Sequence, residues 1–214
     1  MLLQLFKTFV LSKLEYAAPL WLPYLKKDIE KLESVQRTFT SKLEDLEDLN
    51  YHQRLKSLKL YSLQRRRERF CIITMWKIAN DQCPNQLDLE FYNTHRFGIK
   101  CRRKLYNSTT RVHIKTLRQN SFASIGPALF NCIPKSVKNK ETLISFKSAL
   151  DKWLKLLPDE PPISGYVTQN GNSVLEWVGS GHYSLVNFDE RGDTVAREGP
   201  IYGDATVTVA ACCM

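Results

Sequence analysis

Several features are scarce in this 214-residue chain, and their absence narrows the kind of protein it encodes. No apolar run approaches the roughly 18 residues that a membrane-spanning helix requires. The six cysteines include no Cys-x-x-Cys pair, and no basic segment precedes the apolar start of the chain as in an export signal. We therefore expect reduced thiols in an intracellular protein, nuclear or cytoplasmic and not secreted.

Motifs that carry catalysis are also missing. The chain has no Gly-x-Ser-x-Gly, no Gly-rich phosphate loop, no His-Glu-x-x-His and no Asp-Asp pair. Two thiols and two imidazoles, Cys83, His95, Cys101 and His113, are spaced too widely for a structural zinc site, whose ligands come in close pairs. The sequence therefore predicts no catalytic residue, no metal and no cofactor.

The charge divides the chain into two unlike parts. Residues 1–157 hold 29 basic and 14 acidic side chains (29 − 14 = +15), whereas residues 158–214 hold 2 and 8 (2 − 8 = −6). Glycine follows the same division, because only Gly98 and Gly126 precede Pro158. With the hydrophobic pattern, this predicts four regions: helical over 1–92, a basic loop over 93–120, helical again over 121–157, and an acidic Gly-rich tail over 158–214.

Apolar residues recur at helical spacing through most of the basic part, which predicts a mainly α fold. The expected helices are one from Leu2 that ends before Pro19, one from about Lys26 to Leu43, one from Tyr51 to Leu58, one from Ser62 to Ala79, and two between Ser121 and Leu157. Ser62 is the expected N-cap of its helix. Residues 70–79 are apolar on nearly every side, so neighbouring elements must bury them.

The remaining segments carry weaker signals. Leu87–Phe91 fits a short helical turn, and 93–120 reads as a loop with an extended piece at Arg111–Lys115. In the tail, alternating or β-branched runs predict either a few strands or disorder. The three runs are Ser173–Val178, Tyr183–Val186 and Ala205–Ala210.

Two dense groups of cations are the main functional signal. The first is Arg65, Arg66, Arg67 and Arg69, and the second is Lys100, Arg102, Arg103 and Lys104. Such density repels itself unless counter-charges are supplied, and nucleic-acid phosphates commonly supply them. We therefore take these eight residues as candidate nucleic-acid contacts. The alternative is internal pairing of the arginines with the acidic segment Glu44–Asp48, with the second group simply hydrated.

Aromatic residues lie near these cations in the sequence. They are Trp21, Tyr61, Phe97 and Tyr106. Stacking on sugars or bases is one role for them. Aromatics beside helices more often belong to the core, and that alternative stays open here.

Several ordered motifs resemble one family. Residues 13–24 (KLEYAAPLWLPY) and 28–37 (DIEKLESVQR) resemble the segment that follows the polymerase palm in reverse transcriptases of Jockey-like, LINE-type non-LTR retrotransposons. The similarity continues through 54–58, 63–67, 121–122, 131–134 and 145–151, and covers about Leu2 to Trp153. The order and spacing of these motifs carry the resemblance more than any one of them.

The resemblance implies a thumb-like helical region that grips an RNA template and growing DNA through backbone contacts. It also implies that the palm, with the paired aspartates that hold two magnesium ions, would lie before Met1. On this basis we expect a non-catalytic fragment of an RNA-directed DNA polymerase whose partner is RNA, DNA or their hybrid, with no membrane. Two alternatives remain: a helical protein-interaction module that binds an acidic partner, and a retroelement relic without a selected function.

Overall fold

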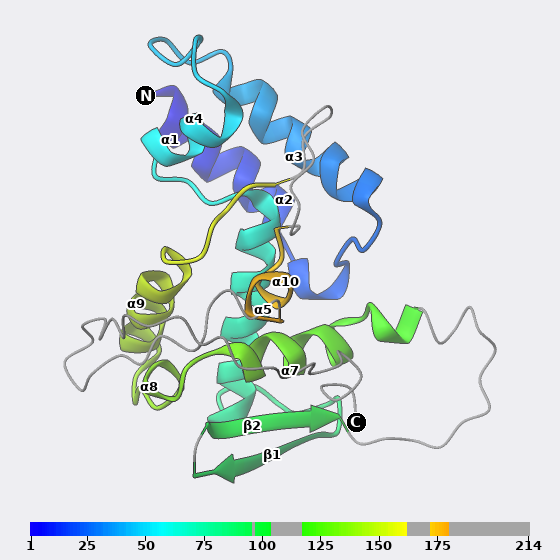
Figure 1. Cartoon of the computed structure of the whole chain (residues 1–214). Coiled ribbons are helices and arrows are strands. Elements are labelled where there is room, and N and C mark those ends of the chain that lie inside the picture. Colours follow the sequence, from blue (N-terminus) through cyan, green and yellow to red (C-terminus); the bar gives the residue numbers. More distant parts are fainter. Residues whose placement is uncertain (96, 104–116, 162–171, 180–214) are drawn as a thin grey trace, which may run out of the picture.

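The computed structural model describes residues 1–95, 97–103, 117–161 and 172–179, and within them the fold is mainly helical with one two-stranded antiparallel sheet. The expected fold class is therefore confirmed. Helix α5 (Leu63–Ala79) runs through the middle of the molecule (Figure 1). The first four helices gather around its N-terminal end, and the sheet and the helices within residues 122–154 gather around its C-terminal half.

The chain begins with one continuous helical segment. It consists of α1 (Leu2–Leu5), a π-helical stretch over Phe6–Leu11, and α2 (Ser12–Glu15). Its inner side packs on α3 (Lys26–Thr40), where the Phe6 and Phe39 rings stack with their centroids 3.9 Å apart. Helix α3 ends three residues before the predicted Leu43.

The starts of α4 (Tyr51–Ser57) and α5 follow local capping rules. Asn50 and Gln53 form a reciprocal capping box at the start of α4. The Ser62 hydroxyl accepts the Arg65 backbone N–H at 3.1 Å, as expected of the N-cap of α5. The apolar half of α5 is buried, with Cys71, Ile72, Met75 and Trp76 fully inaccessible to solvent, which confirms that neighbours cover it.

A β-hairpin follows α5, and here two predictions were wrong. Leu87–Phe91 is not a helical turn, because β1 spans Leu89–Thr94, and the predicted loop 93–120 contains β2 (Gly98–Arg103). The strands pair with Leu89 opposite Arg103 and Thr94 opposite Gly98. Leu89, Phe91, Ile99 and Cys101 alternate along the strands and join the main core, so contact with α7 selects the extended form.

The C-terminal helices complete the main core. They are α7 (Phe122–Cys132), α8 (Lys135–Lys138) and α9 (Leu143–Leu154). Trp76 of α5 stacks on Phe146 of α9 with a centroid separation of 4.8 Å. A Cβ at Gly126 would lie 3.0 Å from the Met75 sulfur, so this glycine permits the close approach of α7 to α5. The two predicted helices are present, and α8 is an additional turn between them.

Part of the acidic tail belongs to this fold. Residues 174–179 form helix α10, so the prediction of a strand over Ser173–Val178 was wrong. The missed signal is Ser173 followed three residues later by Glu176, whose carboxylate accepts the Ser173 backbone N–H at 2.9 Å. The predicted strands Tyr183–Val186 and Ala205–Ala210, and the extended piece at Arg111–Lys115, lie outside the described residues.

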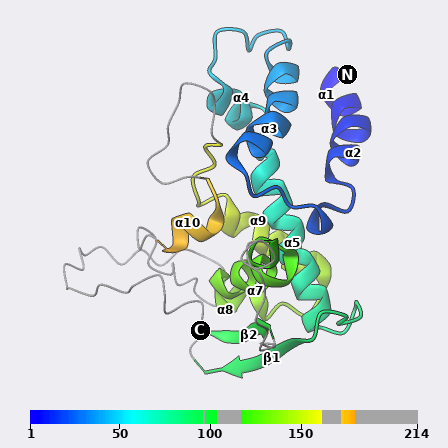
Figure 2. The ribbon, with the colours of Figure 1, turned by 90° about the vertical axis from the view of Figure 1, so that its right-hand side faces the viewer.

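Figure 2 shows the same arrangement from the side, with α1 and α2 at the outer edge of the molecule and α3 on their inner side. Among the helices that the structure describes, each is too short or too polar to cross a membrane.

Candidate nucleic-acid interface

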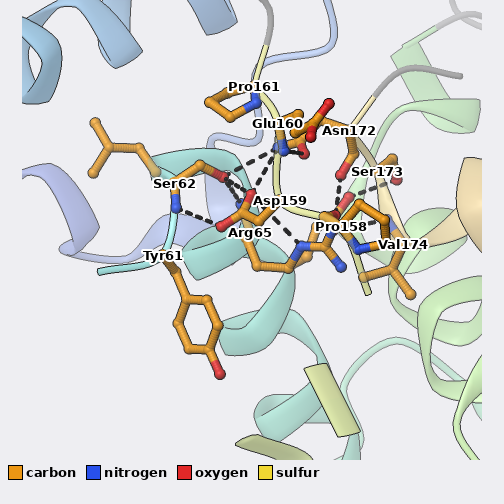
Figure 3. A network of polar contacts seen from close by, with 12 residues as sticks. Tyr61, Ser62, Arg65, Pro158, Asp159, Glu160, Pro161, Asn172, Ser173 and Val174 are labelled. Carbon is orange, nitrogen blue, oxygen red and sulfur yellow. Dashed lines mark hydrogen bonds and ion pairs between the residues drawn. The ribbon is translucent and has the colours of Figure 1, made fainter. Parts of the chain in front are cut away.

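Arg65, in the first cationic group, is an interior residue of the fold. Its side chain is fully buried, and its terminal nitrogen donates to the backbone oxygens of Pro158 at 2.6 Å and Asn172 at 3.1 Å (Figure 3). Its Nε lies 3.9 Å from the Asp159 carboxylate. Arg65 thus fastens the start of the tail onto α5.

The surrounding groups form a connected polar network (Figure 3). Asp159 accepts the Ser62 backbone N–H at 2.7 Å and its hydroxyl at 2.6 Å, while the Asn172 amide donates to both Ser62 and Asp159 at 3.1 Å. Glu68 accepts the Ser173 hydroxyl at 2.5 Å and the Val174 backbone N–H at 3.0 Å. Burial raises the pKa of Glu68, and the Arg65 charge opposes that rise.

The other three arginines of the group also face internal partners. Arg66 pairs with Glu15 on α2, and Arg69 makes a two-point contact with Asp151 on α9 at 2.5 and 2.8 Å. Arg67 is 3% exposed and lies over the Trp21 ring, 6.0 Å from its centroid. Burial lowers the pKa of Arg67, and the negative charge of Glu33 opposes this.

The expected pairing of these arginines with Glu44–Asp48 was wrong, although Arg65, Arg66 and Arg69 do find acidic partners inside the protein. Their acidic partners are Glu15, Asp151 and Asp159, none of which belongs to Glu44–Asp48. Arg66 and Arg69 keep some exposure, at 26% and 21% of their side chains. Arg65 and Arg67 have almost none, so their guanidinium groups lie in the interior of the protein.

The second cationic group lies on the hairpin. Strand alternation places Lys100 and Arg102 on the side opposite Ile99 and Cys101, which enter the core. Arg102 is 70% exposed and pairs across the strands with Glu90 at 2.7 Å. Lys100 lies 4.3 Å from the centroid of the Phe97 ring. Arg103 is the last residue of β2, and Lys104 lies outside the described residues.

The hairpin cations begin a longer stretch without acids, a feature that the sequence predictions did not include. No Asp or Glu occurs between Glu90 and Glu141, while these 50 residues contain eleven lysines and arginines. The fold brings described parts of this stretch together, because β2 contacts both α7 and α8. Lys135 of α8 donates to the His95 backbone oxygen at 3.2 Å. The hairpin and residues 135–140, which comprise α8 and the two residues after it, therefore form one basic lobe.

The pKa of the buried Lys138 reflects the positive charge of this lobe. Its side chain is 2% exposed, its Nζ lies 5.1 Å from the Phe130 ring centroid, and its hydrogen bond to the Asn131 oxygen is long at 3.5 Å. Burial and the positive charge of Lys100 lower the pKa of Lys138 to about 8. The two ammonium groups thus repel each other across β2 and α8.

The interior ion pairs do not cancel the excess of basic over acidic residues in 1–157. Setting aside the four α5 arginines with their partners Glu15 and Asp151 leaves 25 basic and 12 acidic residues in 1–157 (25 − 12 = +13), because Asp159 lies beyond this range. Internal pairing therefore redistributes the candidate contacts and leaves most of the positive charge for a partner.

The structure also describes most of the aromatic and metal-binding candidates. Tyr61 donates its hydroxyl to the Asp151 backbone oxygen, while Trp21 and Phe97 lie beside Arg67 and Lys100. Tyr106 and His113 lie outside the described residues. No cluster of three metal-binding side chains occurs in the part of the chain that the structure describes, where Cys83, His95 and Cys101 lie.

Comparison of the chain with models of protein families, with curated proteins and with solved structures finds no match.

Proposed function

We propose that this chain is a non-catalytic, nucleic-acid-binding region of a reverse-transcriptase-like protein, and that it holds the phosphate backbone of RNA, DNA or their hybrid on the basic lobe. The single observation that carries this proposal is the acid-free stretch 91–140, of which the hairpin and α8 are brought together. The resemblance to non-LTR retrotransposon reverse transcriptases supports the hybrid as the first ligand to test.

Electrostatics favour this lobe over α5 as the phosphate-binding surface. An arginine already paired with a carboxylate must give up that partner before it can bind a phosphate, and a buried arginine must also leave its site. Within the described residues neither Lys100 nor the exposed Lys140 forms an ion pair, and the exposed pair of Arg102 with Glu90 is weak in water. Phosphate contacts of this kind release counterions, so binding is expected to weaken steeply with salt.

The test compares two variants that lose the same charge. One replaces Lys100, Arg102 and Lys140 with glutamine, and the other replaces the exposed Lys31, Lys42 and Lys56 of the N-terminal helices and loops. Binding of a labelled RNA–DNA hybrid of mixed sequence is measured by fluorescence anisotropy between roughly 50 and 200 mM salt. The first variant is expected to lose at least tenfold affinity and about three from the log–log salt slope.

The control variant is expected to stay within about threefold of the parent chain, since its lysines lie outside the lobe. Equal losses in both variants would mean that only net charge matters, and unchanged affinity in the first variant would remove the lobe from the proposal. Either result would overturn it. Neutralising Arg65 or Arg67 is unsuitable as a binding test, because their burial makes folding the first property to change.

A further inference from the structure

The outer face of the hairpin carries an exposed aromatic ring between two cations. Tyr92 of β1 is 43% exposed and lies opposite Lys100 of β2 in the strand register. The guanidinium carbon of Arg102 lies 5.6 Å from the centroid of the Tyr92 ring. Strand alternation places these three residues on the side opposite Phe91 and Cys101, which pack in the core. We call Tyr92, Lys100 and Arg102 the hairpin face.

Another cation and a second aromatic ring lie toward the turn of the hairpin. The Lys100 ammonium nitrogen lies 4.3 Å from the centroid of the Phe97 ring. Lys135 of α8 reaches the same turn, where it donates to the His95 backbone oxygen at 3.2 Å. Figure 1 shows the hairpin at the end of the molecule away from α1 and α3, so this surface lies apart from the N-terminal helices.

The acids of the hairpin segment lie away from its turn. Residues 91–100 contain no Asp or Glu, whereas Asp88 and Glu90 come before them in the sequence. Glu90 pairs with Arg102 across the strands, but the two side chains are 44% and 70% exposed, so the pair is weak in water. A phosphate can therefore compete for Arg102, and the chain from Tyr92 to Lys100 offers it no repelling acid.

This arrangement suits a ligand that joins flat rings to anions. A cation–π contact accounts for Arg102 beside the ring, but that contact leaves Tyr92 43% exposed. Bases in a duplex stack on one another, whereas an unpaired base is free to stack on an aromatic side chain. We propose that the hairpin face binds single-stranded nucleic acid, with one base stacked on Tyr92 and the adjoining phosphates on Lys100 and Arg102. This inference rests on the proposed function, to which it adds recognition of an unpaired base.

The probes are two labelled single strands of DNA of about twelve nucleotides, one of mixed sequence and one made only of abasic sugar–phosphate units. Binding of each to the full chain is measured by fluorescence anisotropy at roughly 50 mM salt. The strand with bases is expected to bind about tenfold more tightly, because both strands carry the same phosphates and only one can stack. Equal affinities would mean that the hairpin face recognises anions alone, and would overturn the proposal.

Three variants locate the stacking contact. Tyr92→Val removes the ring but keeps a side chain that strands favour, and it is expected to weaken binding of the strand with bases about tenfold. Tyr92→Phe keeps the ring and should bind like the parent chain. Tyr24→Val is the matched control, because Tyr24 is 42% exposed and lies before α3, outside the basic lobe. Unfolding temperatures establish that each variant folds, and equal losses in Tyr92→Val and Tyr24→Val would contradict the assignment.

A blunt-ended RNA–DNA hybrid separates this inference from the proposed function. Tyr92→Val should leave hybrid affinity within about twofold of the parent, since duplex bases are already stacked and no cation is lost. If the glutamine variant of Lys100, Arg102 and Lys140 loses hybrid affinity while Tyr92→Val keeps full affinity for the single strand, only the stacking contact is overturned. Unchanged hybrid affinity in the glutamine variant would instead overturn the proposed function, and this inference with it.

Discussion

The two cationic groups look alike in the sequence but occupy opposite environments in the fold. The group on α5 has its charges inside, against acids from α2 and α9 and from the segment after α9. The hairpin group has Arg102 at the surface beside a single acid, in a stretch that otherwise lacks acids. Clustered arginines thus indicate a need for counter-charge, and only the fold decides whether the protein or a ligand supplies it.

The largest expected difference between the groups is in stability. Arg65→Ala is expected to lower the free energy of unfolding by about 3 kcal/mol or more, because Asp159 and two backbone oxygens lose their buried partner. Arg102→Ala is expected to change it by less than about 1 kcal/mol, since its ion pair is exposed. Urea unfolding of both variants measures the difference. Similar values for the two would mean that the groups are not distinct.

The stability of the fold is also expected to depend on pH, through the buried Glu33 of α3. This carboxylate is fully buried, accepts the Tyr51 hydroxyl at 2.5 Å and the Leu63 backbone N–H at 3.0 Å, and is influenced by Arg67 and Asp159. Burial raises the pKa of Glu33 to about 7. Between about pH 4.5 and 7 the folded chain therefore holds a proton that the unfolded chain has released.

This bound proton sets the direction in which the free energy of unfolding changes with pH. The contribution of Glu33 to stability is greatest at low pH and is lost as the pH rises toward 7, by an amount on the order of 3 kcal/mol. Glu33→Gln is expected to remove this part of the pH dependence, which urea unfolding at pH 5, 6, 7 and 8 would measure in both chains. Parallel stability curves for the variant and the parent would contradict the assignment.

Lys138 is expected to show the opposite sign from Arg65. Because its ammonium group is buried with only one long hydrogen bond and is repelled by Lys100, Lys138→Met should raise the free energy of unfolding at pH 7 by about 1 kcal/mol. The gain should shrink above pH 8, where the parent lysine loses its proton. Thermal unfolding at pH 7 and 9.5 tests both statements, and destabilisation at pH 7 would contradict them.

The smallest stability effect is expected for Lys100→Gln on the hairpin surface. Its free energy of unfolding should stay within about 0.5 kcal/mol of the parent, because no buried pair is broken. Its log–log salt slope for hybrid binding should fall by about one, as for one lost phosphate contact. A stability loss as large as that of Arg65→Ala would place Lys100 with the interior group instead.

Local sequence rules were most reliable where one segment contains its own signal. Ser62 and Asn50 cap α5 and α4 as their side-chain chemistry requires, and the apolar surround of α5 from Phe70 onward required burial. They were least reliable where the partner lies far along the chain. Glu68 meets Ser173 across 105 residues, and the hairpin forms on α7, which no local window contains.

The same distinction between local and long-range signals applies to the residues of the candidate site. A mainly helical protein with a basic excess in residues 1–157 and two dense cationic groups could be predicted from the amino-acid sequence. The folded structure was needed to show that Arg65 and Arg67 are interior residues, that residues 172–174 of the acidic tail join the network of Arg65 and Glu68, and that Lys100 and Arg102 lie on an outer strand face. Composition and periodicity are local and additive, whereas the effect of a charge depends on burial and on which opposite charge the folded chain brings within reach.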